Sequence, residues 1–313
     1  MRSFIFTVMN WQNLQKILKS TCCILLAYGI QAQEVEVNDQ LKKRKTILLA
    51  SSASVHIVTM VGLNELWYKD FPRSNLHSFN DSKEWLGMDK IGHATTTYHV
   101  GRAGYSAMQW AGHSENKSLW IGGNMGLFFQ TGVELLDGTS AEWGFSWADM
   151  GANAAGSGLF IAQHLIWREQ RIQLKFSKSK SRYAKYRPSA LGSNWQEEIL
   201  KDYNGQTYWA SIHVFDFVDS EKIVPNWLML SVGYGADGLL GANVNPEFND
   251  LGMSIPFFER QKQWYLSLDV DLSRIEWKRK GFKTFFSVFG FLKIPAPALV
   301  LQNGNFTFEP IHF

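Results

Sequence analysis

Apolar residues in the first half of the chain recur at helical spacing and are interrupted by short polar turns. The pattern predicts helices over Thr46–Trp67, Asp89–Trp110, Leu119–Leu136 and Trp147–Trp167. Glycine and alanine residues lie close together in these segments, and such small residues let helices approach one another. We therefore expect residues 33–167 to form a helical bundle domain of about four apolar, glycine-rich helices.

The last third of the chain instead shows an alternation of apolar and polar residues, which is typical of strands. The clearest alternation runs from Trp264 to Leu272. Further strands are predicted over 207–217, 227–234 and 306–313. Residues 283–293 have an apolar body with lysine at both ends, which suits a membrane interface or the cover of a sheet. The predicted fold class is α+β, mainly α, in which the helical bundle is followed by an α+β tail at residues 188–313.

A basic, serine-rich stretch at residues 168–187 separates the two halves. It is rich in lysine and arginine and holds one acidic residue, Glu169. Runs of like charge are usually solvated and lack a buried face. We expect this stretch to be a basic connector and the boundary between the bundle and the tail.

The first 32 residues have the organisation of an export signal. Two lysines precede the apolar run Thr21–Ile30, and a small-residue cleavage site lies before Gln33. We expect residues 1–32 to be a signal peptide; the alternative is a buried or membrane-anchoring first helix. The apolar run is too short to span a bilayer, which favours cleavage.

Removal of this segment changes the chemistry that the chain can carry. It takes away three basic residues and no acid, so the formal net charge falls from +3 to 0. A neutral chain lacks the basic footprint of a nucleic-acid-binding protein, so we expect no nucleic acid as a partner. Both cysteines, Cys22 and Cys23, leave as well, which excludes disulfides and thiolate metal sites from the mature chain.

The remaining composition favours contact with a membrane. The chain has 13 Trp and 22 Phe, residues that fill large cores or lie among lipid headgroups. The apolar helices also contain acids and amides. The positive-inside rule would assign their basic flanks to the cytoplasm, whereas a cleaved export signal would place both flanks outside it. We therefore expect a cell-envelope protein on the periplasmic side that associates with a membrane, the outer membrane being favoured over the inner. Its expected partner is membrane lipid or another envelope component.

Three of the predicted helices each carry polar side chains on one face, because residues three or four apart on a helix are neighbours. These are Asp89 and His93 on one helix, Gln130, Glu134 and Asp137 on the next, and Asp149 and Asn153 on the last. The core of a bundle is where such faces meet. Three interpretations stay open: a structural network, a pocket for a lipid-like or glycan ligand, and a catalytic site.

In a catalytic site, His93 would be the general base, Asp89 would orient its ring and Glu134 would be the acid. The remaining candidates are binding residues: Lys90, Asp137, Ser146, Asp149 and Asn153. One histidine and scattered carboxylates suit Mg²⁺ or Mn²⁺ only loosely, so we expect no metal site and no cofactor. The favoured function is a membrane-associated structural or binding role, and the alternative is an envelope enzyme acting on lipid or cell-wall precursors.

Three motifs carry a resemblance to a known family. They are Asp89-Lys90-x-x-His93, Glu134-x-x-Asp137-Gly138 and Gly144-Phe145-Ser146-x-x-Asp149-x-x-x-Asn153-x-x-Gly156. Between Trp85 and Leu165 the chain resembles the YfiM-like family of predicted periplasmic lipoproteins, for which no activity is established. The order of the motifs is also similar to that of VanZ-like membrane proteins, and the tail resembles the longer versions found in Bacteroidota. The chain departs from the lipoprotein pattern because no cysteine follows the apolar signal run.

Overall fold

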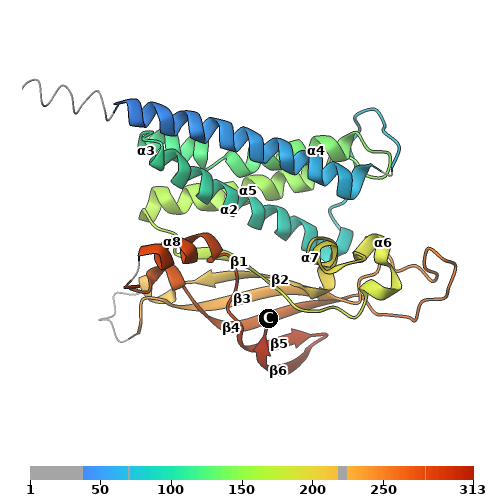
Figure 1. The fold of residues 1–313 in the computed structure, drawn as a ribbon. Coiled ribbons are helices and arrows are strands. Elements are labelled where there is room, and N and C mark those ends of the chain that lie inside the picture. Colours follow the sequence, from blue (N-terminus) through green and yellow to red (C-terminus); the bar gives the residue numbers. More distant parts are fainter. Residues whose placement is uncertain (1–37, 70, 218–223, 279) are drawn as a thin grey trace, which may run out of the picture.

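A computed structural model describes residues 38–69, 71–217, 224–278 and 280–313. The predicted signal peptide and both cysteines lie outside the described residues. A layer of helices lies over one six-stranded antiparallel sheet (Figure 1). This arrangement confirms the α+β class.

The helical layer comes from the first half of the chain. Its main elements are the helix Asn38–Leu63, η1 (Asn64–Tyr68), η2 (Glu84–Gly87), α2 (Met88–Trp110), α3 (Glu115–Lys117), η3 (Ser118–Gly122), α4 (Met125–Gly138) and α5 (Trp147–Trp167). The description as four apolar, glycine-rich helices is not supported. The first helix begins well before Thr46 and contains one glycine, Gly62, while the range Leu119–Leu136 is divided between η3 and α4.

Helix α2 packs closely against α5 and α4 because glycines remove side chains at the crossings. A Cβ atom on Gly156 of α5 would lie 2.0 Å from the carbonyl oxygen of Ala94, and one on Gly126 of α4 would lie 2.4 Å from that of Thr97. Both distances are far below van der Waals contact. These close approaches bring the side chains of α2, α4 and α5 that flank them into one interior.

The sheet is built from the second half of the chain in the order β1-β2-β3-β4-β5-β6. Its strands are β1 (Ile172–Lys178), β2 (Gln206–Ile212), β3 (Leu228–Asp237), β4 (Gln261–Val270), β5 (Ala296–Gln302) and β6 (Asn305–His312). Short helices connect them: η4 (Ala184–Tyr186), α6 (Pro188–Leu191), α7 (Trp195–Lys201), η5 (Tyr203–Gly205), η6 (Val214–Phe217), η7 (Leu272–Arg274) and α8 (Lys280–Phe289).

Strand β1 lies inside the stretch 168–187 that its charge marked as a connector. Its side chains Ile172, Leu174 and Phe176 are apolar, and the alternate side chains Gln173, Lys175 and Ser177 are buried. The charge of Lys175 suggests a solvated segment, but its ammonium group forms an ion pair inside the fold, so the charge pattern fails to predict this strand. Strand β5 was also missed, because Pro295 and Pro297 flank and interrupt its beginning and a proline within a run argues against a strand.

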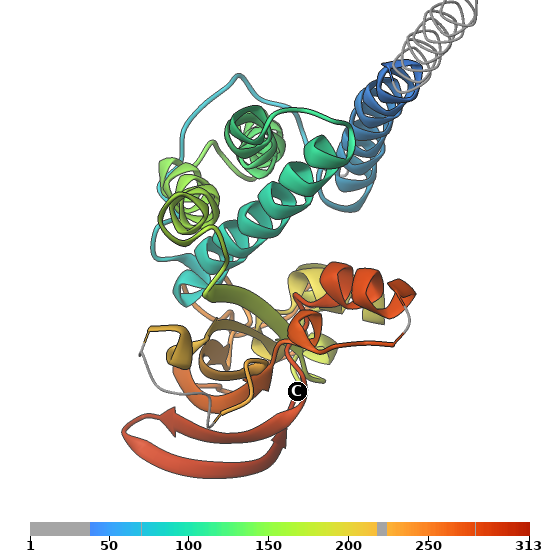
Figure 2. The ribbon, with the colours of Figure 1, turned by 90° about the vertical axis from the view of Figure 1, so that its left-hand side faces the viewer.

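The sheet curls until its first strand meets the segment that leads into β5 (Figure 2). The backbone N–H of Phe176 donates to the carbonyl of Phe291 (2.8 Å), and the N–H of Lys293 donates to the carbonyl of Phe176 (2.9 Å). One face of the curled sheet thus becomes enclosed, while the other faces outward.

Helix α2 covers part of the outward face. Met88 at its beginning packs against Tyr234 and Ala236, and Tyr98 OH donates to the carbonyl of Ile172 (3.2 Å). The remaining outward face, over β4 to β6, carries no helix in the described part of the chain (Figure 2).

The crossing of α2 and α5 gives a direct test of this packing. Gly156→Ala should lower the free energy of unfolding by about 1–3 kcal/mol, because the added methyl group collides with the backbone of Ala94 and overpacks the crossing. The measurement is urea unfolding followed by circular dichroism.

The matched control is Gly158→Ala on the same helix, where an added Cβ would have no neighbour within 4 Å. There alanine should leave stability unchanged or raise it by up to about 1 kcal/mol, because it is the better helix former. Equal effects of the two substitutions would contradict the close crossing.

Candidate functional site

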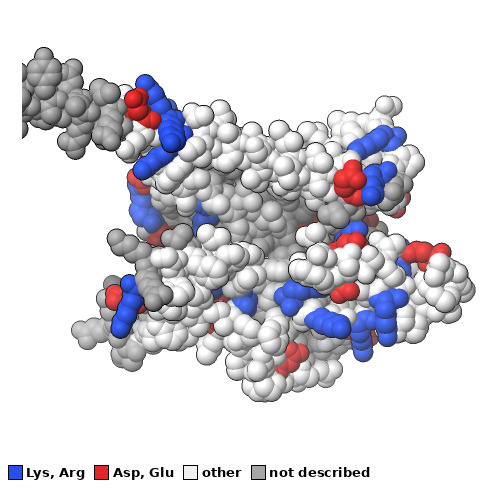
Figure 3. All heavy atoms as spheres, in the orientation of Figure 1, with Lys and Arg blue, Asp and Glu red and all other residues white. Residues whose placement is uncertain are grey.

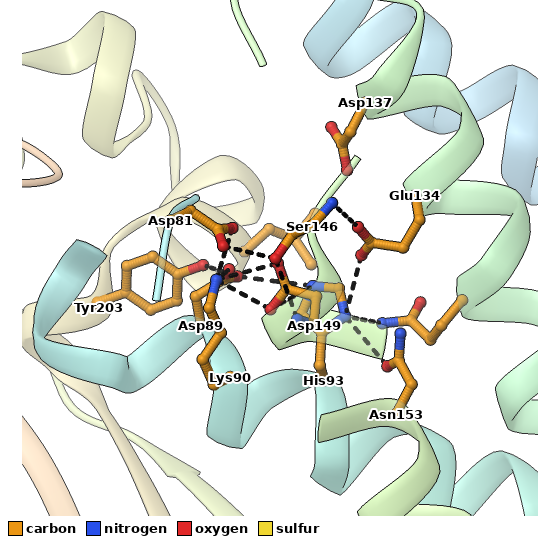
Figure 4. A network of polar contacts seen from close by, with 12 residues as sticks. Asp81, Asp89, Lys90, His93, Glu134, Asp137, Ser146, Asp149, Asn153 and Tyr203 are labelled. Carbon is orange, nitrogen blue, oxygen red and sulfur yellow. Dashed lines mark hydrogen bonds and ion pairs between the residues drawn. The ribbon is translucent and has the colours of Figure 1, made fainter. Parts of the chain in front are cut away.

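Ten polar residues from α2, α4, α5 and two other segments converge where the helical layer meets the sheet (Figure 4). We call this group the polar centre: Asp81, Asp89, Lys90, His93, Gln130, Glu134, Ser146, Asp149, Asn153 and Tyr203. Its members are linked to one another by hydrogen bonds and ion pairs.

His93 lies in the middle of the polar centre. Its Nδ1 is 3.1 Å from Asn153 Oδ1 and 3.1 Å from Gln130 Nε2. Gln130 can donate to a bare Nδ1, whereas a protonated Nδ1 donates to Asn153. Glu134 Oε1 lies 3.6 Å from the same nitrogen. The ring is therefore held from α4 and α5 on its Nδ1 side.

The other ring nitrogen faces two carboxylates. His93 Nε2 is 3.7 Å from Asp89 Oδ1 and 3.9 Å from Asp149 Oδ1. These distances are those of ion pairs and are too long for hydrogen bonds. Asp89 Oδ1 instead accepts a hydrogen bond of 2.7 Å from Tyr203 OH, which comes from the turn before β2.

Lys90 supplies the fixed positive charge of the polar centre. Its Nζ is 2.6 Å from Asp81 Oδ2, 3.1 Å from Asp89 Oδ2 and 2.9 Å from Asp149 Oδ1. The three acids come from a loop, from α2 and from α5. Removing the ammonium group would leave three closely spaced carboxylates without their cation, which is a costly arrangement in a largely buried site.

Ser146 connects the loop, α4 and α5. Its Oγ accepts from the N–H of Asp149 (3.0 Å), which is the N-cap hydrogen bond that begins α5. The same hydroxyl donates to Asp81 Oδ1 (2.5 Å), and the backbone N–H of Ser146 donates to Glu134 Oε2 (3.0 Å). A residue recognisable as a helix cap thus also fixes two carboxylates.

The structure brings together most of the residues that the sequence pattern singled out. Those in contact are Asp89, Lys90, His93, Gln130, Glu134, Ser146, Asp149 and Asn153. Asp137 shares a helix face with Glu134, but its Oδ1 accepts from Tyr68 OH (2.7 Å) and it has no hydrogen bond or ion pair to the polar centre. It anchors the end of the N-terminal helical segment instead.

Two members of the polar centre were missed. Asp81 lies in a loop, where no periodicity assigns a side chain to a face, and it is 65 residues away from the Ser146 hydroxyl that it contacts. Tyr203 lies 114 residues from Asp89. It lies in the tail, and the spacing of residues within the helices of the first half gives no signal for a contact with a residue there.

Burial governs the protonation of the inner acids. It raises the pKa of Glu134 to about 8, and together with the charge of Asp89 it raises the pKa of Asp149 to about 7. For Asp89, burial is outweighed by the charges of His93 and Lys90, so its pKa lies below its usual range. At neutral pH Glu134 is therefore mainly a neutral proton donor, while Asp89 is a carboxylate.

The pKa of His93 is raised, because the surrounding carboxylates outweigh the effect of burial. The ring thus favours its cationic form. Together with Lys90, it balances the ionised acids of the polar centre. The general-base role expected for His93 is therefore disfavoured, since a base must be deprotonated before it reacts.

Asp89, His93 and Asp149 each offer a ligand atom, and these atoms lie within 4.8 Å of one another. Such a set could hold a divalent ion such as Zn²⁺ or Mn²⁺. The ammonium group of Lys90 already contacts both carboxylates, so an ion would compete with it for the same oxygens.

The polar centre is closed on most sides. Glu134 is 1% exposed and Asn153 is fully buried, whereas the side chain of Asp89 keeps a quarter of its surface accessible. Access is therefore limited to the Asp89 side. Most of its polar groups are hydrogen-bonded or ion-paired, although Glu134 Oε1 and Asn153 Nδ2 have no hydrogen-bond partner. The closure favours a structural network that joins the loop, α2, α4, α5 and the turn of Tyr203.

The protonation of Glu134 predicts how stability depends on pH. Its pKa is raised from 4.5 to about 8 on folding, so the folded state holds more protons and loses stability as pH rises between these values. His93 and Asp149 act in the same direction. Glu134→Gln should flatten the fall in unfolding free energy between pH 5 and 8 by up to about 1.4 kcal/mol per pH unit.

The measurement is urea unfolding at a series of pH values, and Glu142→Gln, at an exposed position in the loop before α5, is the control. Glutamine retains an oxygen that can accept from the Ser146 N–H, so the substitution changes the titration with little change in shape. If the Glu134→Gln protein and the original protein showed the same pH dependence, the proton on Glu134 would be ruled out as its source.

A comparison with protein families finds a match over the part of the chain that contains the three sequence motifs. Residues 77–163, less than half of the chain, match the family model described as Predicted periplasmic lipoprotein (DUF2279). The matched range contains every member of the polar centre except Tyr203. Comparisons with curated proteins and with solved structures give no match. The likeness of this part of the chain to a predicted periplasmic lipoprotein family is thus confirmed, and it supports a periplasmic location in the cell envelope.

Proposed function

We propose that the protein is a membrane-associated component of the cell envelope that binds lipid through its N-terminal helix and presents the polar-centred bundle beside the membrane. The helix Asn38–Leu63 carries this proposal. It is long and apolar enough to cross a membrane, with a mean hydropathy of 1.7 in its most apolar stretch, and none of that stretch is buried within the fold.

Many of the exposed side chains of this helix are large and apolar, so their contact with water is unfavourable. Leu49 is 74% exposed and Val58 is 70% exposed, and between Thr46 and Leu63 the helix has no Asp, Glu, Lys or Arg. Transferring one such side chain out of water is worth about 1.5–3 kcal/mol when burial is complete. The helix packs against the fold along one side, where the ring of His56 lies 5.6 Å from that of Phe129 in α4 and Arg44 lies over the ring of Trp110 in α2.

Four consecutive basic residues, Lys42 to Lys45, lie at the beginning of the uncharged stretch. Figure 3 shows the corresponding cluster of positive side chains at one end of the helix. Near an anionic lipid surface each such residue contributes about 1 kcal/mol of attraction. The helix therefore combines an apolar surface with a basic end suited to lipid phosphates.

The proposed partner is membrane lipid or another envelope component, and no nucleic acid. We favour the outer membrane over the inner, because an export signal and basic flanks on the helices are difficult to reconcile with an inner-membrane topology. The similarity of the motif order to the VanZ-like membrane proteins is in keeping with a membrane location.

Flotation with vesicles of phosphatidylethanolamine and phosphatidylglycerol tests the proposal. The full chain should rise with the lipid on a density gradient. Replacing Val58 and Val61 by Asp should lower the bound fraction strongly, because each acid costs about 2.5–3.5 kcal/mol in the middle of an apolar helix in lipid. Both valines are exposed, so folding should be retained.

The matched control places the same two acids at Val244 and Leu251, which are at least as exposed and lie in the loop between β3 and β4. This variant should float like the original protein. Membrane binding through the helix is wrong if the two double variants bind lipid equally, or if the original protein stays in the aqueous fractions.

A second candidate is an envelope enzyme acting on lipid or cell-wall precursors. The observation that favours it is the position of His93 between carboxyl groups on both sides of its ring, beside the partly accessible Asp89. With its pKa raised, His93 fits a proton donor to a leaving group rather than a base.

Replacing His93 by Gln separates this candidate from a structural role. An enzyme should lose the ability to complement an envelope defect of a deletion strain while the folded yield and the unfolding midpoint remain near normal. A structural centre should instead lose yield and complementation together, because the amide cannot replace the imidazolium between the acids. Normal complementation at normal yield would end the catalytic candidate.

A further inference from the structure

Part of the curled sheet carries polar residues on its enclosed side and apolar residues on its outward side. Along β3 and β4 the enclosed side chains include Ser231, Ser267 and Asp269 beside the apolar Met229 and the ring of Tyr265, and the outward side chains between the strand ends are apolar. Ser231 is fully buried while its neighbour Val232 is 42% exposed, and Ser267 is buried while Leu268 is 55% exposed. A half-solvated antiparallel sheet normally shows the opposite arrangement, with apolar residues inward.

The outward residues form one continuous surface. Directly paired residues on neighbouring strands share a face, and the register pairs Val232 with Leu266, Leu266 with Leu299, and Leu299 with Phe308. We call this surface the outer face; its residues include Val232, Trp264, Leu266, Leu268, Leu299 and Phe308. Of the β4 residues on this face, only Lys262, at one end of the strand, is charged. The outward residues of β4 between Lys262 and the other end of the strand are uncharged.

The enclosed side holds the charges that a soluble sheet would expose. Lys175 Nζ lies 2.7 Å from Asp269 Oδ2, and the side chains of both are almost completely buried. Lys293 Nζ lies 4.0 Å from the other oxygen of Asp269, and Ser211 Oγ donates to Oδ2 at 2.8 Å. Burying these groups is costly even when they are paired. The enclosed side thus holds buried charges together with the apolar cluster of Trp209, Tyr265, Ala298 and Val300, while the outer face exposes hydrocarbon.

Alternation of apolar residues outward and polar residues inward is the pattern of strands whose outer surroundings are lipid. We propose that the outer face of the sheet is a second lipid-contacting surface, on which β4, β5 and β6 lie against a membrane. The proposal rests on the proposed membrane association and adds a surface that is separate from the N-terminal helix.

The shape and the ends of the outer face favour lipid over a second copy of the chain. The face lies on the outside of a curled sheet and is convex (Figure 2). Two convex faces would touch along a narrow strip, whereas lipid tails adapt to such a surface. Beside the seam where β1 meets residues 291–293, α8 adds further exposed apolar residues, including Phe285 and Val288.

One end of the outer face has the chemistry of a lipid headgroup region. A groove of about 420 Å³ opens there, and its lining includes Arg260, Lys262 and Trp264. Basic side chains attract lipid phosphates, and tryptophan is enriched at the boundary between hydrocarbon and headgroups. Along β4, basic residues come first, then a tryptophan, then apolar residues. This order matches the change from headgroups to hydrocarbon across one leaflet of a membrane.

Site-specific labelling in the full chain tests the proposal. With Cys22 and Cys23 replaced by Ser, a single new cysteine can carry an environment-sensitive fluorophore at Leu266, at Phe308 or, for comparison, at Val58 of the N-terminal helix. A label at Glu142, in the exposed loop before α5, is the solvent control. The probe is a vesicle of phosphatidylethanolamine and phosphatidylglycerol with spin labels in the lipid tails, and aqueous iodide is the opposing quencher.

Labels at Leu266 and Phe308 should shift to shorter emission wavelengths on vesicle addition, lose quenching by iodide and gain quenching by the lipid spin labels. The label at Glu142 should keep its iodide quenching. If the Val58 label enters lipid while the Leu266 and Phe308 labels stay accessible to iodide, the outer face is not a lipid surface and the proposed function stands. If none of the labels enters lipid, both proposals fail.

Discussion

The buried ammonium group of Lys90 is the interaction on which the helical layer depends. It pairs with acids from the loop before α2, from α2 itself and from α5, and each of these acids is fixed in turn by a second partner. Burying three carboxylates near one another is unfavourable unless cations and protons offset their repulsion. Lys90 and a cationic His93 supply the charges, and the protonated Glu134 supplies the remaining relief.

This constraint explains why the polar centre joins so many elements. Ser146 links the loop to α4 and α5, and Tyr203 links α2 to the turn that precedes β2. A hydrogen-bonded network in a medium of low polarity is stabilising only when its members are satisfied together. These polar contacts and the packing of Met88 against Tyr234 and Ala236 together hold the helices and the sheet in one relative position.

The same distribution of polarity recurs in the sheet. The Lys175–Asp269 ion pair lies inside the curl, and Leu266 and Leu268 lie outside it. Charged groups are therefore buried in the polar centre and inside the curled sheet. Apolar residues are exposed on the helix Asn38–Leu63 and on the outer face of the sheet. Large exposed apolar surfaces are unfavourable in water and are typical of sites that contact a membrane or another protein. The proposed contact with lipid would account for them.

Features that depend on local spacing could be predicted from the amino-acid sequence. The limits of α5, the cap at Ser146 and the helix faces of His93, Glu134 and Asn153 follow from periodicity along single elements. The contacts of Asp81 and Tyr203 with the polar centre could not be predicted, because they cross long stretches of chain and exist only after the tertiary structure has formed. The tertiary structure also decided which face of the sheet is enclosed: alternation from Trp264 to Leu272 predicts a strand, but it assigns neither side to the interior until strand pairing and curl are fixed.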